Sequence, residues 1–434
     1  MTSAFTTMSV HGARVHVLPT DRFKTYAVSV YIGYPLREDT VTKVALIPFV
    51  LRRGTETWPE TKQFRAKLDD LYGAGFGFDI YKRSAAQIVN IRMDSIHDRY
   101  VKDDRSLLEE TMRYVGEAIT RPALADGAFR ADYVEAEKDT LKKRIESLIN
   151  NKIRYAAERC TEEMFRGDPY RLLSLGRKEE IDALDPSSLY RHYLHWLQEA
   201  SIDIFVVGQL DPADVERLVA QHFAWDRQEA ADYPAPQPFR RTGDVNRVEE
   251  RMEVNQGKLN LGFRTSVTYS DDDYPAALVF NGVFGAFPHS KLFINVREKA
   301  SLAYYASSRL DGFKGALTVQ SGIAVSNYDK AVDIILRQLD AMRRGEISDL
   351  EWNQTKAMIV NQLRETQDSA FEMIAMEFNN VLSGRRRTVS QLIEEVSAVT
   401  REQVKKVAGQ IELDTIYFLR DMSEGGGADE HDEG

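Results

Sequence analysis

The stretch SKLFINVREKASLAY, at positions 290–304, carries the strongest local signal for the fold of this chain. It places a guanidinium at Arg297 and a phenol at Tyr304. A planar guanidinium makes charge-assisted hydrogen bonds to a peptide carbonyl or carboxylate, and a phenol can donate to a carbonyl that develops oxyanion character. The two side chains therefore have the chemistry to bind a peptide. The structural alternative is that Arg297 pairs with Glu298 or Asp311 while Tyr304 packs in a core.

The order of elements around this stretch occurs twice in the chain. Residues 64–78 and 87–93 predict an amphipathic helix that runs into a small-residue strand and then a second strand. Residues 293–308 and 316–323 show the same order, and two helical segments follow in each case. The chain therefore predicts two copies of one α+β unit, each of about 200 residues.

Local patterns predict further elements in the first copy. Alternating apolar residues at 13–18 and 26–31 predict the two strands of a hairpin. Residues 42–53 have the pattern of a helix, and the apolar run at 202–207 is typical of a buried strand.

A change of composition divides the two copies. We expect an N-terminal domain over 1–224, a proline-rich linker over 225–247 and a C-terminal domain over 248–422. The glycine-rich acidic segment 423–434 has the composition of a disordered tail.

Composition excludes several classes of protein. The 434 residues include 57 basic and 67 acidic side chains, and this net charge of −10 disfavours nucleic acid and anionic membranes as partners. The longest apolar run, at 45–51, is far too short to span a bilayer. A single cysteine, Cys160, rules out an internal disulfide, and no secretory signal opens the chain, so we expect a cytoplasmic protein.

Several dispersed motifs together resemble the insulinase/pitrilysin family of zinc metallopeptidases, particularly its small two-domain members similar to the mitochondrial processing peptidase. The resemblance covers roughly residues 10–420, and its motifs are the 290–304 stretch, FRGDPY at 165–170 with Gly176, Gly208 with Asp211, and Gln256 with Gly262-Phe263. It implies an α+β fold of two homologous domains, each a mainly antiparallel sheet covered by helices, joined by an extended linker. It also implies that Arg297 and Tyr304 are the substrate-binding pair of the second domain.

The zinc motif of the family is missing. Its His-x-x-Glu-His precedes a Gly-Thr pair, which stands here at 54–55, so the three motif positions fall on Ala45, Pro48 and Phe49. These side chains cannot coordinate zinc or activate water. The third ligand aligns with Arg144, a cation. We expect no catalytic residue at these positions and no metal, and Pro48 should kink or interrupt its helix.

Other candidate sites are weaker. His192 and His195 are spaced for one helical face, but nothing beside them completes a metal site. His431 lies in the acidic tail, and Cys160 lies on a charged helix where it is expected to be structural. The glycines at 73–77 follow a helix and open none, which excludes a phosphate-binding loop.

The combination resembles the noncatalytic subunit of the family's heterodimeric peptidases. The chain alone should be inactive and hold no cofactor, while a homologous partner subunit supplies the zinc and this chain binds the peptide substrate. The alternative is a non-proteolytic structural or peptide-binding homologue. Neither the peptide nor the partner is identified by the sequence.

Overall fold

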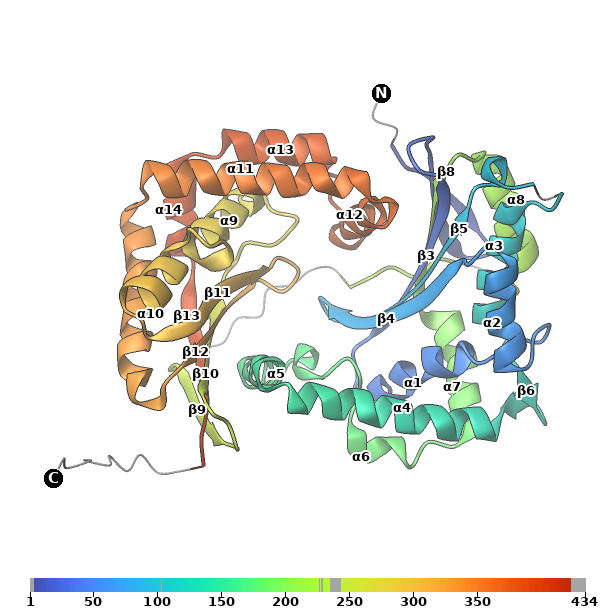
Figure 1. Ribbon diagram of the computed structural model, residues 1–434, viewed down its shortest axis with the longest axis horizontal. Helices are drawn as coiled ribbons and strands as arrows, with labels where there is room; N and C mark the ends of the chain where they lie inside the picture. The colour runs from blue at the N-terminus through green and yellow to red at the C-terminus, as the bar shows by residue number, and fades with distance from the viewer. Residues whose placement is uncertain (1–3, 103, 226, 228, 235–242, 423–434) are drawn as a thin grey trace, which may run out of the picture. The chain divides into compact units, whose positions relative to one another are not determined.

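The computed structural model describes residues 4–102, 104–225, 227, 229–234 and 243–422, which form two compact units (Figure 1). Unit 1 is formed by Met1–Ser147, Leu172–Ala235 and Thr366–Arg386. Unit 2 is formed by Leu148–Arg171, Pro236–Glu365 and Arg387–Gly434. Each unit therefore takes one segment from the other half of the sequence.

Unit 1 is built on a six-stranded sheet in which only one neighbouring pair, β2 and β8, runs parallel. In spatial order its strands are β1 (Thr6–Val10), β2 (Ala13–Pro19), β8 (Ser201–Gly208), β3 (Thr25–Pro35), β5 (Ala86–Ile96) and β4 (Gly75–Arg83). The other elements are α1 (Val41–Leu51), α2 (Thr61–Asp70), η1 (Asp98–Tyr100), α3 (Leu107–Thr120), β6 (Leu124–Ala125), β7 (Ala128–Phe129), most of α4 (Ala131–Asn150), α6 (Lys178–Ile181), α7 (Pro186–Glu199), α8 (Pro212–His222), η6 (Thr366–Asp368) and α12 (Ala370–Ser383).

Helices cover both faces of this sheet. Side chains alternate between the faces of a strand, so Tyr26 and Tyr31 of β3 point to opposite sides. Ser95, paired with Tyr26 across the strands, bonds Thr111 of α3 at 2.7 Å. On the other face Tyr31 stacks on Phe378 of α12, with ring centroids 3.8 Å apart. A helix from the second half of the sequence thus completes the core of unit 1 (Figure 1).

Unit 2 has a five-stranded sheet, again with one parallel pair, β9 and β13. In spatial order its strands are β9 (Asn246–Arg251), β13 (Glu412–Arg420), β10 (Gly257–Arg264), β12 (Ala316–Ile323) and β11 (Ala303–Asp311). Its helices are α5 (Lys152–Met164), η2 (Pro169–Arg171), α9 (Tyr274–Asn281), the π-helical turns η3 (Gly282–Ala286) and η4 (Phe293–Lys299), η5 (Val325–Asn327), α10 (Tyr328–Arg344), α11 (Asp349–Glu365), α13 (Val389–Ala398) and α14 (Arg401–Gly409).

The two sheets share one topology. Without β1, the sheet of unit 1 has the order β2-β8-β3-β5-β4, and the sheet of unit 2 has the order β9-β13-β10-β12-β11. In each of these orders, the strand that comes first in the sequence lies parallel to the strand that comes last, and the other strand directions also agree. Strand β1 is an addition at one edge of unit 1. The predicted α+β fold of two similar, mainly antiparallel units is confirmed.

Helix α5 belongs to unit 2 although it comes from the first half of the sequence. It packs against β10 and β13. A Cβ atom at Gly262 of β10 would lie 2.6 Å from the sulfur of Met164, so only glycine permits this close approach. Cys160 is buried in the same contact, and burial raises the pKa of its thiol to about 12, which makes it unreactive.

The predicted hairpin between 13–18 and 26–31 is wrong. Both strands exist, but β8 lies between them, parallel to β2 and antiparallel to β3. The hairpin partner of β2 is β1, through a tight turn at His11 and Gly12 with φ values of 48° and 71°. Alternation along a strand indicates which residues are buried but not which strand lies beside it.

Pro48 does not interrupt its helix. Helix α1 runs from Val41 through Pro48 to Leu51, close to the predicted 42–53. An internal proline costs about 3 kcal/mol in an isolated helix. Here almost every side chain of α1 is buried, and this packing outweighs the lost hydrogen bond.

The predicted linker and tail are only partly described. Trp225 and Arg227, at the start of the predicted linker, are buried in unit 1, where Arg227 donates to the carbonyl groups of Ala200 at 2.5 Å and Gly12 at 3.3 Å. Residues 235–242 and the tail 423–434 with His431 lie outside the described residues. The domain boundaries 1–224 and 248–422 stay a prediction.

Candidate functional site

The three positions of the missing zinc motif lie on α1 and are buried. Ala45 and Phe49 stand one turn apart on the same face of the helix, with 0% and 2% of their surface exposed, and Pro48 lies beside them. Phe49 packs edge to face on Phe78 of β4, with ring centroids 4.8 Å apart. Apolar packing therefore stands where a zinc site would need imidazoles and a general base.

Two guanidinium groups flank the Phe49 ring. The Cζ atom of Arg52 lies 5.3 Å from its centroid and 5.6 Å from that of Phe78. The Cζ atom of Arg144, on α4, lies 5.7 Å from the Phe49 centroid. The structure thus brings the position aligned with the third zinc ligand next to the position aligned with the second histidine. Arg144 repels a metal cation, and Phe49 has no atom that could coordinate one.

A buried carboxylate lies next to this group but is engaged by arginines. Glu137 of α4 is 2% exposed and accepts hydrogen bonds from Arg53 Nε at 2.6 Å and from an Arg52 amino group at 3.2 Å. Sequence reasoning missed this contact. The available signal was the pair of arginines that directly follows the apolar helix α1. Within the described part of the chain, no group of three or more His, Cys, Asp or Glu residues could hold a metal ion.

The predicted substrate-binding pair lies in unit 2, on two irregular backbone segments. Arg297 is exposed on the π-helical turn η4, and its Cζ atom lies 4.6 Å from the centroid of the Phe293 ring. Tyr304 follows at the start of the edge strand β11, where the pairing register shifts between Ala303 and Tyr305. The bulge leaves Tyr304 unpaired and turns it outward, with 77% of its surface exposed. Such irregularities are frequent at functional sites.

The structure does not show the structural alternative for this pair. Among the described residues Arg297 has no ion pair with Glu298 or Asp311. Asp311 is occupied elsewhere, because it accepts a hydrogen bond from the Tyr170 hydroxyl and others from the backbone N–H groups of Phe313 and Lys314. Tyr304 is not in a core. Both side chains are therefore free to meet a ligand.

The two histidines on α7 do not form a metal site. Their rings are 6.4 Å apart, and His195 Nε2 lies 3.1 Å from a carboxylate oxygen of Glu199. Burial and, to a smaller extent, the charge of Lys43 lower the pKa of His192 to about 4, so this ring is neutral near pH 7. His192 packs edge to face on Tyr34. The half-buried ring of His192 therefore has a packing role.

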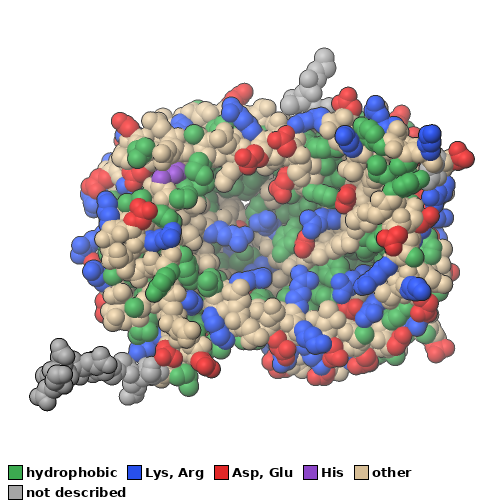
Figure 2. All heavy atoms as spheres, in the orientation of Figure 1, with side chains coloured by type: hydrophobic (Ala, Val, Ile, Leu, Met, Phe, Trp, Pro, Cys, Tyr) green, Lys and Arg blue, Asp and Glu red, His purple; other side chains and the backbone are tan. Residues whose placement is uncertain are grey.

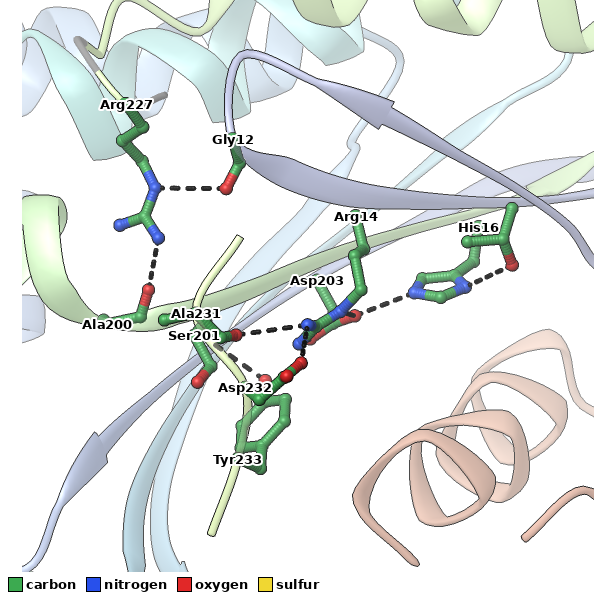
Figure 3. Close-up of polar contacts among 11 residues, drawn as sticks. Gly12, Arg14, His16, Ala200, Ser201, Asp203, Arg227, Ala231, Asp232 and Tyr233 are labelled. Atoms are coloured by element: carbon green, nitrogen blue, oxygen red, sulfur yellow. Dashed lines mark hydrogen bonds and ion pairs between the residues drawn. The ribbon is translucent and has the colours of Figure 1, made fainter. Parts of the chain in front are cut away.

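Sequence reasoning also missed a polar cluster inside unit 1 (Figure 3). Asp203 of β8 is fully buried and accepts two hydrogen bonds from Arg14, at 2.8 and 2.9 Å, in a bidentate pair. His16 Nε2 lies 2.8 Å from the same carboxylate, and Thr7 lies 3.0 Å from His16 Nδ1. Arg14 also donates to the exposed Asp232 at 3.1 Å.

The environment of Asp203 keeps it ionised. Burial by itself raises the pKa of a carboxyl group, but the hydrogen bonds and charges of Arg14 and His16 outweigh it here. The pKa of Asp203 therefore lies below its ordinary value. No nucleophile activated for catalysis is part of this cluster, whose position between neighbouring strands indicates a structural role.

A comparison with known proteins places the chain in a family. The "Probable inactive metalloprotease YmfF" of Bacillus subtilis (strain 168) is 39% identical over 409 residues, which cover 94% of this chain and 96% of that protein. The chain belongs to the M16, or insulinase-like, peptidase family. The family model described as "Peptidase M16 inactive domain" matches residues 183–359. The resemblance inferred from the motifs is confirmed, and the chain is an inactive M16 homologue.

The chain is also similar to a solved structure and to a biosynthesis protein. A solved structure described as a conserved protein from Enterococcus faecalis V583 superposes with a TM-score of 0.90 at 34% identity, over 98% of this chain and all of that one. The "Antilisterial bacteriocin subtilosin biosynthesis protein AlbE" of Bacillus subtilis is 26% identical over 63% of this chain and 68% of that protein.

No helix in the described ranges is long and apolar enough to cross a membrane.

Proposed function

We propose that this chain is the noncatalytic subunit of a heterodimeric zinc metallopeptidase and that it binds peptide substrate for a homologous, zinc-bearing partner. The observation that carries the proposal is an asymmetry between two units of one topology. Unit 1 has an apolar residue at each zinc-motif position, whereas unit 2 presents an exposed arginine and an exposed tyrosine on irregular backbone.

The chemistry of the pair suits a peptide in a partner's active site. Arg297 can anchor a carbonyl or carboxylate with two parallel hydrogen bonds, and Tyr304 can donate to an oxygen that gains negative charge. Zinc from the partner would polarise the scissile carbonyl and activate water. The relationship to a bacteriocin biosynthesis protein favours a peptide, such as the leader of a ribosomally made precursor, as substrate.

The exposed edges of the sheets offer a way to hold such a peptide. Among the described residues, strands β4 and β11 each end a sheet, so each has backbone groups without a neighbouring strand. On β4 a Cβ atom placed at Gly77 would meet no atom within 4 Å, so the face of this edge strand is open there. An extended peptide could add to such an edge as a further strand.

Reconstitution with a partner tests the proposal. A candidate partner is a homologue of similar length with an intact His-x-x-Glu-His motif, recovered by co-expression and pull-down. The isolated chain should contain no stoichiometric zinc and should leave a quenched peptide uncut. The proposal fails if the chain alone carries about one zinc and cuts the peptide in a chelator-sensitive way.

Variants of unit 2 test the role of the pair. In the assembled pair of subunits, Arg297→Ala and Tyr304→Phe should each lower turnover by roughly 100- to 1000-fold, the range seen when one such donor is removed, and leave assembly intact. Lys299→Ala is a matched control because Lys299 is exposed on the same turn. Unchanged kinetics in both variants would exclude the assigned residues. Assembly without any proteolysis would instead support the structural alternative.

A further inference from the structure

We propose that the group formed by Phe49, Phe78, Arg52 and Arg144, here called the Phe49 cluster, binds a carboxylate carried by a peptide. All four residues belong to unit 1. The inference rests on the proposed function, because it names the class of peptide that a noncatalytic subunit would hold. It gives a binding function to the part of unit 1 where the zinc motif is missing.

The charges around the Phe49 cluster do not cancel. Two guanidinium groups, those of Arg52 and Arg53, bond the buried carboxylate of Glu137, and a third, that of Arg144, lies over the Phe49 ring. Among the described residues, no other side chain donates to Glu137. The local balance is therefore positive, although the whole chain carries −10. Figure 2 shows Lys and Arg side chains on the surface over α4 and β4.

Arg144 is the group most available to an anion. Its side chain is exposed, and among the residues that the structure describes it has neither a hydrogen-bond nor an ion-pair partner. The guanidinium of Arg144 lies over the Phe49 ring, a contact that does not use its N–H groups. An arginine held in this way has lost part of its conformational freedom before a ligand arrives.

Arg52 provides a second set of donors against the same ring. Its side chain is 37% exposed, and one amino group is committed to Glu137 at 3.2 Å. The remaining N–H groups lie over Phe49 and Phe78. Planar guanidinium groups match the two oxygens of a carboxylate better than they match a neutral amide.

The aromatic rings indicate that the carboxylate belongs to a peptide. Phe78 is half-buried and packs on the buried Phe49 ring beside the two arginines, and its apolar surface favours an anion that is attached to an apolar side chain over a small inorganic ion. Phe78 lies on β4, an edge strand of the sheet. A peptide along this edge would bring either its C-terminal carboxylate or an acidic side chain to the Phe49 cluster.

Short peptides bound to the isolated full-length chain test the inference and separate the two sources. The first pair is N-acetyl-Leu-Phe with a free carboxylate and its C-terminal amide, and the second is N-acetyl-Leu-Glu-Phe amide and its Gln counterpart. Peptide-observed NMR at low salt measures each affinity. We expect about tenfold tighter binding for the acid in one pair or in both, because charge-assisted hydrogen bonds are lost in the neutral peptide.

Substitutions locate the effect. Arg144→Gln should abolish the preference for the acid, Arg144→Lys should keep part of it, and circular dichroism should show that both variants are folded, since Arg144 is exposed. Lys143→Gln is the matched control: it removes one exposed charge from the neighbouring position of α4 and should keep the preference.

Three results would overturn the inference. They are equal binding of acid and amide in both pairs, an equal loss of preference in Lys143→Gln and Arg144→Gln, and displacement of the peptides by inorganic phosphate at the same concentration. None of these results bears on assembly with a zinc-bearing partner or on Arg297 and Tyr304, so failure of this inference and failure of the proposed function are distinguishable.

Discussion

Asp203 shows how a single buried carboxylate fixes the neighbouring strands. It is fully buried, and its oxygens accept from Arg14 on β2 and from His16 two residues along the same strand. A buried charge is tolerated only when its hydrogen bonds are satisfied, so the three side chains act as a unit. The parallel pairing of β2 and β8 brings them into register.

Removing this carboxylate should destabilise unit 1 strongly. Asp203→Asn leaves the largely buried Arg14 without its main counterion, and breaking a buried pair costs about 3 to 5 kcal/mol. Urea denaturation followed by circular dichroism measures the loss. Asp232→Asn is the control, because Asp232 bonds the same arginine but is 95% exposed, and its loss should cost less than about 1 kcal/mol. Equal effects of the two variants would contradict the assigned role.

The same group gives the stability a defined dependence on pH. The folded pKa of Asp203 is lowered relative to an unfolded value of about 4, so its contribution is complete above that pH. It is lost as the pH falls from about 4 through the folded pKa, because the carboxylate must then bind a proton. The free energy of unfolding, measured between pH 6 and 3, should fall more steeply in the unmodified chain than in Asp203→Asn. Parallel curves would contradict this.

At the scale of elements, each unit is completed by a helix from the other half of the sequence. Phe378 of α12 is buried against Tyr31 of β3 at 3.8 Å and against Phe205 of β8 at 6.2 Å. Aromatic side chains buried in this way contribute most of the packing energy of a small contact. Helix α12 is therefore a core element of unit 1, although about 160 residues separate it from β8 in the sequence.

Truncating this contact should loosen α12. Phe378→Ala should lower the free energy of unfolding by about 3 to 5 kcal/mol, as for other buried phenylalanines. Hydrogen exchange should also become faster over residues 370–383 and over β3. Glu372→Gln, at an exposed position of the same helix, should leave both quantities unchanged. Unaltered exchange in Phe378→Ala would show that α12 is not part of the core.

Some of these features could be predicted from the sequence and others could not. Helices such as α2 and α7 follow from periodicity and caps over a few neighbouring residues, and the pair Arg297 and Tyr304 follows from one short motif. Other contacts join residues that are far apart in the sequence. Arg52 and Glu137 are 85 positions apart, and the insertion of β8 between β2 and β3 joins residues nearly 190 positions apart. No local pattern encodes such pairings, because they are chosen by the packing of the whole unit.

At the scale of the molecule, neither half of the sequence contains a complete unit. The first half lacks α12, and the second half lacks α5, which packs on β10 and β13. A sheet without its covering helix exposes an apolar face, and such faces lead to association. The chain is therefore expected to fold as a whole.

Cutting the chain tests this expectation. A fragment of residues 1–235 expressed alone should be insoluble or should unfold without cooperativity. Co-expression with residues 236–434 should recover a soluble complex of the two fragments. Solubility, size-exclusion chromatography and thermal unfolding give the readout. A cooperative fragment 1–235 with the Tm of the intact chain would contradict the expectation.

The burial of α1 makes it difficult for single substitutions to restore a zinc motif in this chain. Ala45→His would force a large ring into a site with no exposed surface, Pro48→Glu would bury a carboxylate, and Phe49→His would remove the packing on Phe78. Each single step back destabilises the protein without restoring a metal site, since all three are needed together. Selection can therefore refine what this chain binds much more easily than it can return it to hydrolysis.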